Sequence, residues 1–498
     1  MHFYKSFIRV GAALLVMAVS PWIVLADGSV PATTTAPQPA TQPTLEHWTL
    51  HPSRISGEPF RFQLLPKLSD MTSGNAASLY RAASRLWPDS KVADMVLNPN
   101  GKRFEWQPID GVSRKDAEAL LGAYADTLHL VDQAARRKDA DWSDDLWVSS
   151  DGVVKSFYFY NELLHAGNLL SFRARYQVSQ NDWNGAEFTL QTLLATARKL
   201  DLFFQQKVFV WLAICDGGKE WMTRAGSPNL FWSLNNLPHP FIDTWPTEER
   251  ERFPAIETGL YQVYRGEQPK WPWKQVMIEM IGDLQEITLP KRQSPAEIEA
   301  QAEKVVASTY PRAKQYLLAA GLAKGKVDGM SPDEAVATYF CRESRVAADE
   351  LWKYWDLPFP QAQDGMFRAW KALDPDRLPL RDNPVFQWNE VRYQWMGEST
   401  PQRPIYRYPK RLMVRYMLTE ADRDIAIFQV IEALRDYAAR HDGNPPARLE
   451  EIQDLPLPLD PFTGKPFDYS ATGKKARLVA LTPWWPGTGW NLEVTFEK

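Results

Sequence analysis

Two segments of this sequence begin with the same four-residue pattern, Ser-Pro-x-Glu, which is a signal for the start of an α-helix. The pattern occupies residues 294–297 and 331–334. The Ser side chain can accept a bond from the backbone N–H three residues later, and Pro fits the first helical position because no hydrogen bond is needed from its nitrogen. Ser113, with Asp116 three residues on, predicts a third start of this kind.

Apolar residues recur at three- and four-residue steps behind such starts, as one buried helix face requires. After Ser113 this spacing runs from Ala117 to Val131, and a later helix is predicted to begin at Thr419 and to end before Gly443. From about Trp48 to Leu68 the chain is interrupted by Pro and predicts a loop or short edge strands. We therefore predict a mainly α fold, an irregular array of helical hairpins.

The composition fits a folded globular chain without a nucleic-acid partner. Of 498 residues 44% are hydrophobic, and 57 Lys and Arg face 61 Asp and Glu for a formal net charge of -4. No block of like charges resembles a nucleic-acid arm or a polybasic membrane patch. The unusual feature is the number of Trp residues, which is 21.

The N-terminus has the pattern of an export signal. Basic residues precede an apolar run from Val10 to Leu25, so residues 1–26 are predicted to be a signal peptide and the mature chain to begin near Asp27. An uncleaved anchor is the alternative, and the membrane is a partner only in that case. We expect export to the periplasm or the exterior. Residues 27–46 are rich in Pro and Thr and predict a solvated linker.

Export would place the two cysteines, Cys215 and Cys341, in an oxidising compartment. Their spacing leaves open whether they form a disulfide or remain two buried thiols, and we favour the thiols. Neither belongs to a Cys-x-x-Cys pair, so no metal or redox role is indicated.

Residues 169–200 contain two apolar-periodic segments separated by Gln180-Asn181-Asp182. Leu170, Ala174, Ala186 and Leu190 make this stretch resemble one degenerate tetratricopeptide-type helix pair, although it does not recur at the 34-residue period. The Pro-bounded segment 228–240 that follows resembles part of a family of uncharacterised exported bacterial proteins. That resemblance implies no biochemical role.

The C-terminal region carries a second resemblance. Leu434, Tyr437, Gly443, Pro446 and Leu449, followed by residues 459–469, resemble the globular part of type II secretion major pseudopilins. The resemblance implies a helix, a Gly-x-x-Pro turn, a loop and a small antiparallel sheet. Residues 482–487 lack the acidic residues of the calcium loop expected there, so we expect no bound calcium. The long N-terminal apolar helix that polymerises pilins is not contiguous with this module, so we expect no filament assembly. We divide the chain into residues 1–26, 27–46, a helical domain at 47–415 and a pseudopilin-like α+β module at 416–498.

Catalytic motifs are absent from the sequence. No nucleophile elbow, phosphate-binding loop, dinucleotide fingerprint or His-Glu-x-x-His is found, and we assign no catalytic, cofactor or metal residue. Glu343 and Glu350 are seven residues apart and would share a helix face, as a general acid and base could, but we favour a solvated face with ordinary surface ion pairs.

The Trp residues offer the remaining candidate site. Trp484, Trp485 and Trp490 are flanked by Pro and Gly, so they are the most loop-like of the indoles and the candidates for ligand contact. The leading hypothesis is an exported, noncatalytic helical protein that binds an unknown protein partner in the cell envelope. The alternative is an extracellular carbohydrate-binding protein or glycan-acting enzyme that uses the Trp platforms and the paired Glu.

Overall fold

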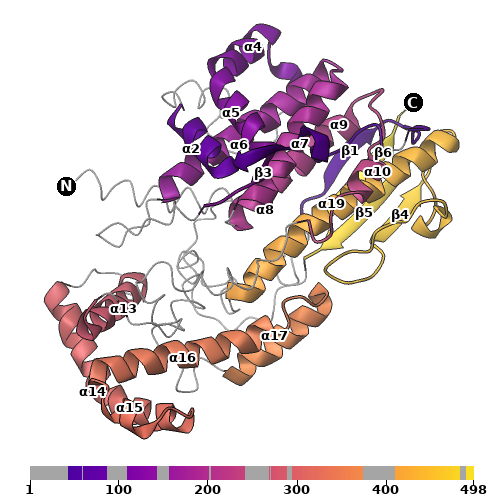
Figure 1. The fold of residues 1–498 in the computed structure, drawn as a ribbon. Coiled ribbons are helices and arrows are strands. Elements are labelled where there is room, and N and C mark those ends of the chain that lie inside the picture. The colour runs from indigo at the N-terminus through magenta and orange to yellow at the C-terminus, as the bar shows by residue number, and fades with distance from the viewer. Residues whose placement is uncertain are drawn as a thin grey trace, which may run out of the picture. The chain divides into compact units, whose positions relative to one another are not determined.

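The protein is mainly helical with a small four-stranded sheet, as predicted (Figure 1). The structure, a computed structural model, describes residues 43–58, 60–86, 109–142, 156–200, 203–241, 269, 271–288, 294–373, 410–482 and 489–497. The predicted signal peptide and nearly all of the predicted linker lie outside these residues. The described residues form two compact units, one within Met1–Asp144, Ser156–Asp243 and Met417–Lys498, the other within Asp145–Lys155 and Thr244–Tyr416.

In the first unit α2, α4, α5, α8, α9 and η4 pack against a hairpin of α6 (Ser156–Ser179) and α7 (Trp183–Lys199). The turn between these two helices places Asn181 at a φ of 58°, and Asp182 caps α7 by accepting a bond from the Gly185 N–H. The predicted pair of helices is therefore present. The helical segments of this unit are α2 (Ala76–Arg85), α4 (Arg114–Ala123), α5 (Ala125–Ala135), α6 (Ser156–Ser179), α7 (Trp183–Lys199), α8 (Phe203–Trp211), the π-helical η4 (Leu212–Gly218), α9 (Lys219–Thr223), α10 (Phe231–Asn235) and most of α19 (Lys410–Arg440), with 3-10 turns η1 (Leu68–Asp70), η2 (Ile109–Gly111) and η8 (Leu449–Glu451).

Two helix boundaries differ from the sequence prediction. The segment behind Ser113 is two helices, because the backbone leaves helical geometry at Tyr124. Thr419 does not start a helix: α19 begins at Lys410, and Thr419 is buried within it. Residues 410–418 contain no Gly or Pro that would stop a helix, so the helix extends through the capping signal.

The sheet of the C-terminal region has the strand order β1-β6-β5-β4. Strands β4 (Asp468–Thr472), β5 (Lys475–Leu481) and β6 (Gly489–Phe496) are antiparallel, and β1 (Glu46–Leu50) pairs in parallel with β6. A strand from residues far upstream thus completes the C-terminal sheet. A separate two-stranded sheet pairs β2 (Thr72–Asn75) with β3 (Arg137–Asp139).

Glycines set the turns around α19 and the sheet. Gly443 has a φ of 83° and its N–H bonds to the Ala438 carbonyl, which ends α19 as the sequence predicts. Gly464 has a φ of 65° in the turn closed by the Asp460–Lys465 bridge. Alternate residues of β5 are buried, as for a strand with one face on a core.

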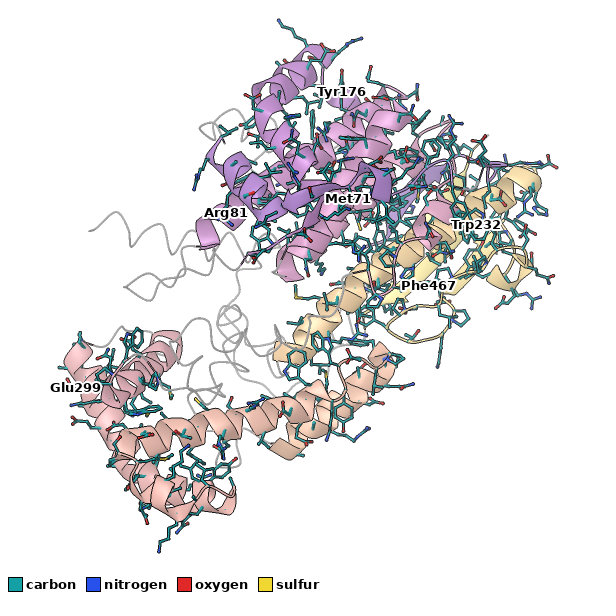
Figure 2. The ribbon with its side chains drawn as sticks, viewed as in Figure 1. Met71, Arg81, Tyr176, Trp232, Glu299 and Phe467 are labelled. Carbon is teal, nitrogen blue, oxygen red and sulfur yellow. The ribbon has the colours of Figure 1, made fainter. Side chains whose placement is uncertain are left out.

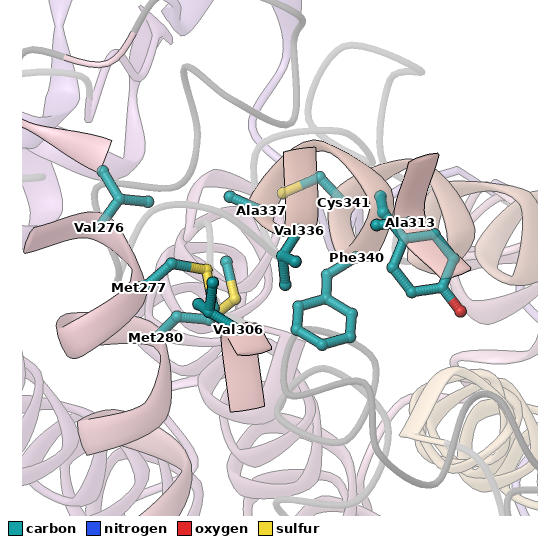
Figure 3. Packing of buried hydrophobic residues seen from close by; sticks show 10 residues of the cluster. Val276, Met277, Met280, Val306, Ala313, Val336, Ala337, Phe340 and Cys341 are labelled. Carbon is teal, nitrogen blue, oxygen red and sulfur yellow. The ribbon is translucent and has the colours of Figure 1, made fainter. Parts of the chain in front are cut away.

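The second unit contains the two Ser-Pro-x-Glu helices, and both starts are confirmed. Ser294 forms a complete capping box with Glu297, and the Ser331 side chain accepts a bond from the Glu334 N–H. Val306, Val336, Phe340 and neighbouring Met and Ala side chains form the core between three helices (Figure 3). The helices of this unit are α13 (Trp273–Thr288), α14 (Pro295–Ala319), α15 (Lys324–Asp328), α16 (Pro332–Trp352) and α17 (Phe359–Leu373).

Candidate functional site

Of the three Trp residues selected from the sequence, the structure describes Trp490, whereas Trp484 and Trp485 lie outside the described residues. Trp490 is half-buried at the start of β6, and its indole N–H donates to Asp424 Oδ1 at 2.8 Å. Its ring meets Trp48 and Phe428 edge to face, each at a centroid distance of 5.8 Å. These contacts make the Trp490 ring part of the packing between β1, β6 and α19.

The two candidate carboxylates on α16 lie in different environments. Glu343 is buried and accepts a hydrogen bond of 2.9 Å from the Tyr339 hydroxyl, with Arg312 at 3.8 Å. Glu350 is exposed and pairs with Lys353. The structure therefore does not join them in one acid–base site.

A buried polar cluster around η4 was not predicted from the sequence. Seven consecutive residues, Leu212–Gly218, form a π-helix and all are buried. A Cβ on Gly217 would lie 2.6 Å from the Leu190 side chain, and one on Gly218 would lie 3.3 Å from Phe428. Glycine therefore lets this segment pass closely between α7 and α19, and π-helical turns are frequent at functional sites.

Asp216 is the acidic residue of this π-helix. Its carboxylate accepts a 3.2 Å hydrogen bond from the Ser171 hydroxyl of α6, and Arg175 from the same helix is an electrostatic partner. Burial raises the pKa of Asp216 to about 6, although the nearby Arg175 and the Ser171 bond oppose the rise. Arg175 also lies 3.5 Å from the Glu220 carboxylate.

Asp424 is a second buried acid beside the same segment. Burial and the negative charge of Glu420 raise its pKa to about 6, while the bond from Trp490 opposes the rise. Cys215 is within electrostatic range of both Asp424 and Asp216, and its own burial is the main cause of a raised thiol pKa. A thiol held in its protonated form is a poor nucleophile.

Lys219 connects this cluster to the upstream strand β1. Its ammonium group lies 3.1 Å from a Glu46 carboxylate oxygen and 4.7 Å from the centroid of the Trp48 ring. The Trp48 indole N–H donates to the same carboxylate at 3.0 Å. One lysine thus fixes β1 against the end of the π-helix.

The cluster has the character of a buried junction and not of an open pocket. The neighbouring cavity, bounded by Leu64, Ile214, Leu230 and Phe428, has a volume of about 10 Å³ and an almost wholly apolar lining. That volume is about the size that one water requires, and an apolar cavity stays dry. Within the described residues, no group of three or more His, Cys, Asp or Glu side chains could hold a metal ion.

A different arrangement lies on the surface of the first unit, around Arg136. The Arg136 guanidinium lies over the exposed Phe188 ring, 3.6 Å from its centroid, and donates to Thr192 Oγ1 at 3.0 Å. The Arg136 carbonyl accepts a 2.8 Å bond from the Thr72 N–H, which anchors the chain just after Leu68. Leu68 is 88% exposed, in the turn that precedes Met71 (Figure 2).

Charged residues tie this turn to α7. Lys67 and Arg61 act electrostatically on Glu187, which precedes Phe188, and Asp70 acts on Arg136. Leu68 and Phe188 are therefore exposed apolar side chains on two segments that both contact Arg136, one through the Thr72 backbone and the other through its ring. We call Leu68, Arg136 and Phe188 the Arg136 surface.

The sequence contained only weak signals for these features. The pair Gly217-Gly218 within an apolar helical stretch indicates that another segment packs closely against this backbone. The sequence does not identify that segment, because the partners on α7 and α19 are far away along the chain. Leu68 follows Pro66 in a region predicted to be a loop, and nothing local indicates that Arg136 anchors it.

Comparisons with protein families, curated proteins and solved structures found no match to this chain. Among the residues that the structure describes, no helix is long and apolar enough to cross a membrane.

Proposed function

We propose that this chain is an exported, noncatalytic helical protein that binds another protein in the cell envelope. The single observation that carries the proposal is the Arg136 surface, on which Leu68 and Phe188 are exposed. Large apolar side chains that gather at one place on a surface mark interaction sites, and aromatic residues and Arg are enriched in protein interfaces.

The way this surface is held supports the same proposal. Leu68 lies in a turn whose end is bonded to Arg136, and Arg136 is itself fixed by Thr192 and stacked on Phe188. A surface ordered before binding loses less conformational entropy when the partner arrives. The export part of the proposal rests on the basic and apolar pattern of residues 1–26.

The direct test is photo-crosslinking in intact cell envelopes. A photoreactive amino acid replaces Leu68 in one variant and Val346, which is 57% exposed in the other unit, in the control. We expect a defined protein adduct from position 68 that is absent or much weaker from position 346. A second variant, F188S, should reduce the adduct formed at position 68.

Equal adduct patterns at the two positions would contradict the proposal. Loss of export after deletion of residues 1–26 tests the location separately, because it does not depend on what the Arg136 surface binds. A glycan array with the purified chain tests the carbohydrate alternative, and reproducible binding there would favour that alternative.

A further inference from the structure

The two outer strands of the four-stranded sheet differ in what lies beside them. The outer strand β1 packs against α9, and Lys219 at the start of that helix bonds to Glu46. Strand β4 pairs with β5 on one side, and among the described residues no backbone hydrogen bond is made along its other side. An open strand edge can pair with another extended chain.

The hairpin register determines which groups of β4 point to this open edge. Thr472 pairs with Lys475 across a two-residue turn in which Gly473 has a φ of 57°. A pair that closes such a turn exchanges both of its hydrogen bonds, and hydrogen-bonded pairs then alternate along the hairpin. The N–H and C=O groups of Tyr469 and Ala471 therefore point away from β5.

The side chains of β4 leave this edge accessible. Asp468, Ser470 and Thr472 are exposed, and Tyr469 and Ala471 are half-buried on the opposite face. The Tyr469 hydroxyl donates to the Pro446 carbonyl at 2.8 Å, which holds the strand in place. Natural edge strands are often protected by a Lys, a Pro or a bulge, and β4 contains none of these.

We propose that a second copy of this chain pairs with β4 along this edge, antiparallel and with Ser470 on the two-fold axis. In this register Tyr469 of each copy faces Ala471 of the other, and the two residues exchange N–H···O=C bonds. The pairing gives hydrogen-bond partners to the N–H and C=O groups of Tyr469 and Ala471 in each strand. Both copies use the same surface, so the assembly ends at two chains, as in the common two-fold dimers.

The charges along the hairpin favour a second copy in this orientation. Each strand begins with Asp468 and ends at Thr472, and Lys474 follows in the turn, whereas Lys475 on β5 is paired with Glu493 of β6. Antiparallel pairing places the acid of one copy opposite Thr472 and near Lys474 of the other. Parallel pairing would place like charges together, which is unfavourable for residues directly opposite each other.

A series of single cysteines in the full-length chain tests the register. S470C places two thiols across the axis, where the Cα separation of an antiparallel pair, about 4.5–5.5 Å, suits a disulfide. D468C and T472C are matched controls, because each puts its two thiols about 13 Å apart, four residue steps along the strands. The native Cys215 and Cys341 are buried, and the wild-type chain controls for them.

We expect S470C to form a disulfide-linked dimer many times faster than D468C or T472C under mild oxidation. Light scattering of the wild-type chain should show its mass rising with concentration from 57.1 kDa toward twice that value. S470K places two like charges on the axis and should abolish the rise, whereas S470A should preserve it. Circular dichroism melting of both variants shows that each is folded.

Equal disulfide rates in the three cysteine variants would overturn the proposal. A wild-type mass that stays at one chain at every concentration, or an S470K variant that still dimerises, would overturn it as well. None of these results bears on the Arg136 surface, so the proposed function stands or falls separately.

Discussion

Arg435 and Glu432 of α19 form an ion pair from which solvent is fully excluded, with both side chains 0% exposed. The Arg435 guanidinium donates to both Glu432 oxygens, at 3.0 and 2.8 Å. Its remaining N–H groups donate to the His51 carbonyl and to Ser227. The pair thus joins α19 to the chain that follows β1 and to the turn before α10.

Removal of one member of this pair should strongly destabilise the chain. R435M leaves the Glu432 carboxylate buried without its partner, and the loss of one partner of a buried pair costs about 3–5 kcal/mol. The double variant R435M/E432L should recover a large part of this loss. Urea unfolding followed by circular dichroism measures the free energy of unfolding of the single and the double variant.

The exposed pair between Arg114 and Glu118 provides the control for that experiment. It joins residues four apart on the surface of α4, and R114M should cost at most about 1 kcal/mol. If R435M and R114M lowered the free energy of unfolding by similar amounts, the buried pair would not be what holds α19 to the chain after β1.

Mild acid should stabilise the first unit. Asp216 and Asp424 have pKa values raised by burial from 3.8 to about 6, so the folded chain holds these two protons more tightly than the unfolded chain does. The free energy of unfolding therefore decreases as the pH rises from about 4 to about 6. Above that range each of the two carboxyl groups lowers it by up to about 3 kcal/mol relative to its value below pH 4.

The D216N variant isolates the contribution of one carboxyl group. Its free energy of unfolding should increase less than that of the wild type when the pH falls from 7.5 to 5, because the amide does not titrate. Urea midpoints at both pH values measure the difference. Equal pH dependence in the two proteins would mean that the Asp216 pKa is not raised in the folded chain.

Gly217 should not tolerate a methyl group. The Cβ of G217A would lie 2.6 Å from the Leu190 Cδ2 atom, and overpacking of this kind costs about 1–3 kcal/mol. At Gly122 in α4 a Cβ would meet no atom within 4 Å, so G122A should stabilise the chain by about 0.4–1 kcal/mol. Thermal melting of the two variants should therefore shift in opposite directions, and a shift in the same direction would contradict the close approach at η4.

The two cysteines should be unreactive in the folded chain. Both are free and buried, and burial raises both thiol pKa values, that of Cys341 to about 12. A thiol reagent at pH 8 should label neither until urea is added, and should then label both. Rapid labelling of the folded chain at either position would show that the thiol is accessible.

Local features were predictable where neighbours along the chain decide the structure. Ser294 and Ser331 cap helices because the groups they bond to are three residues away. Gly443 ends α19 because a positive φ is needed at that one position. The predicted helix start at Thr419 was wrong, since the residues before it are also good helix formers and the capping signal alone cannot interrupt them.

Short-range patterns were thus enough to predict a mainly helical chain and the ends of several of its helices, and a family resemblance implied the small sheet after the last helix. They could not indicate that β1 completes that sheet, that Lys219 meets Glu46, or that Arg435 reaches the His51 carbonyl. The last two contacts join residues 173 and 384 positions apart. Their energies come from burial and pairing between distant segments, which exist only once the chain has folded and which no local pattern of side chains records.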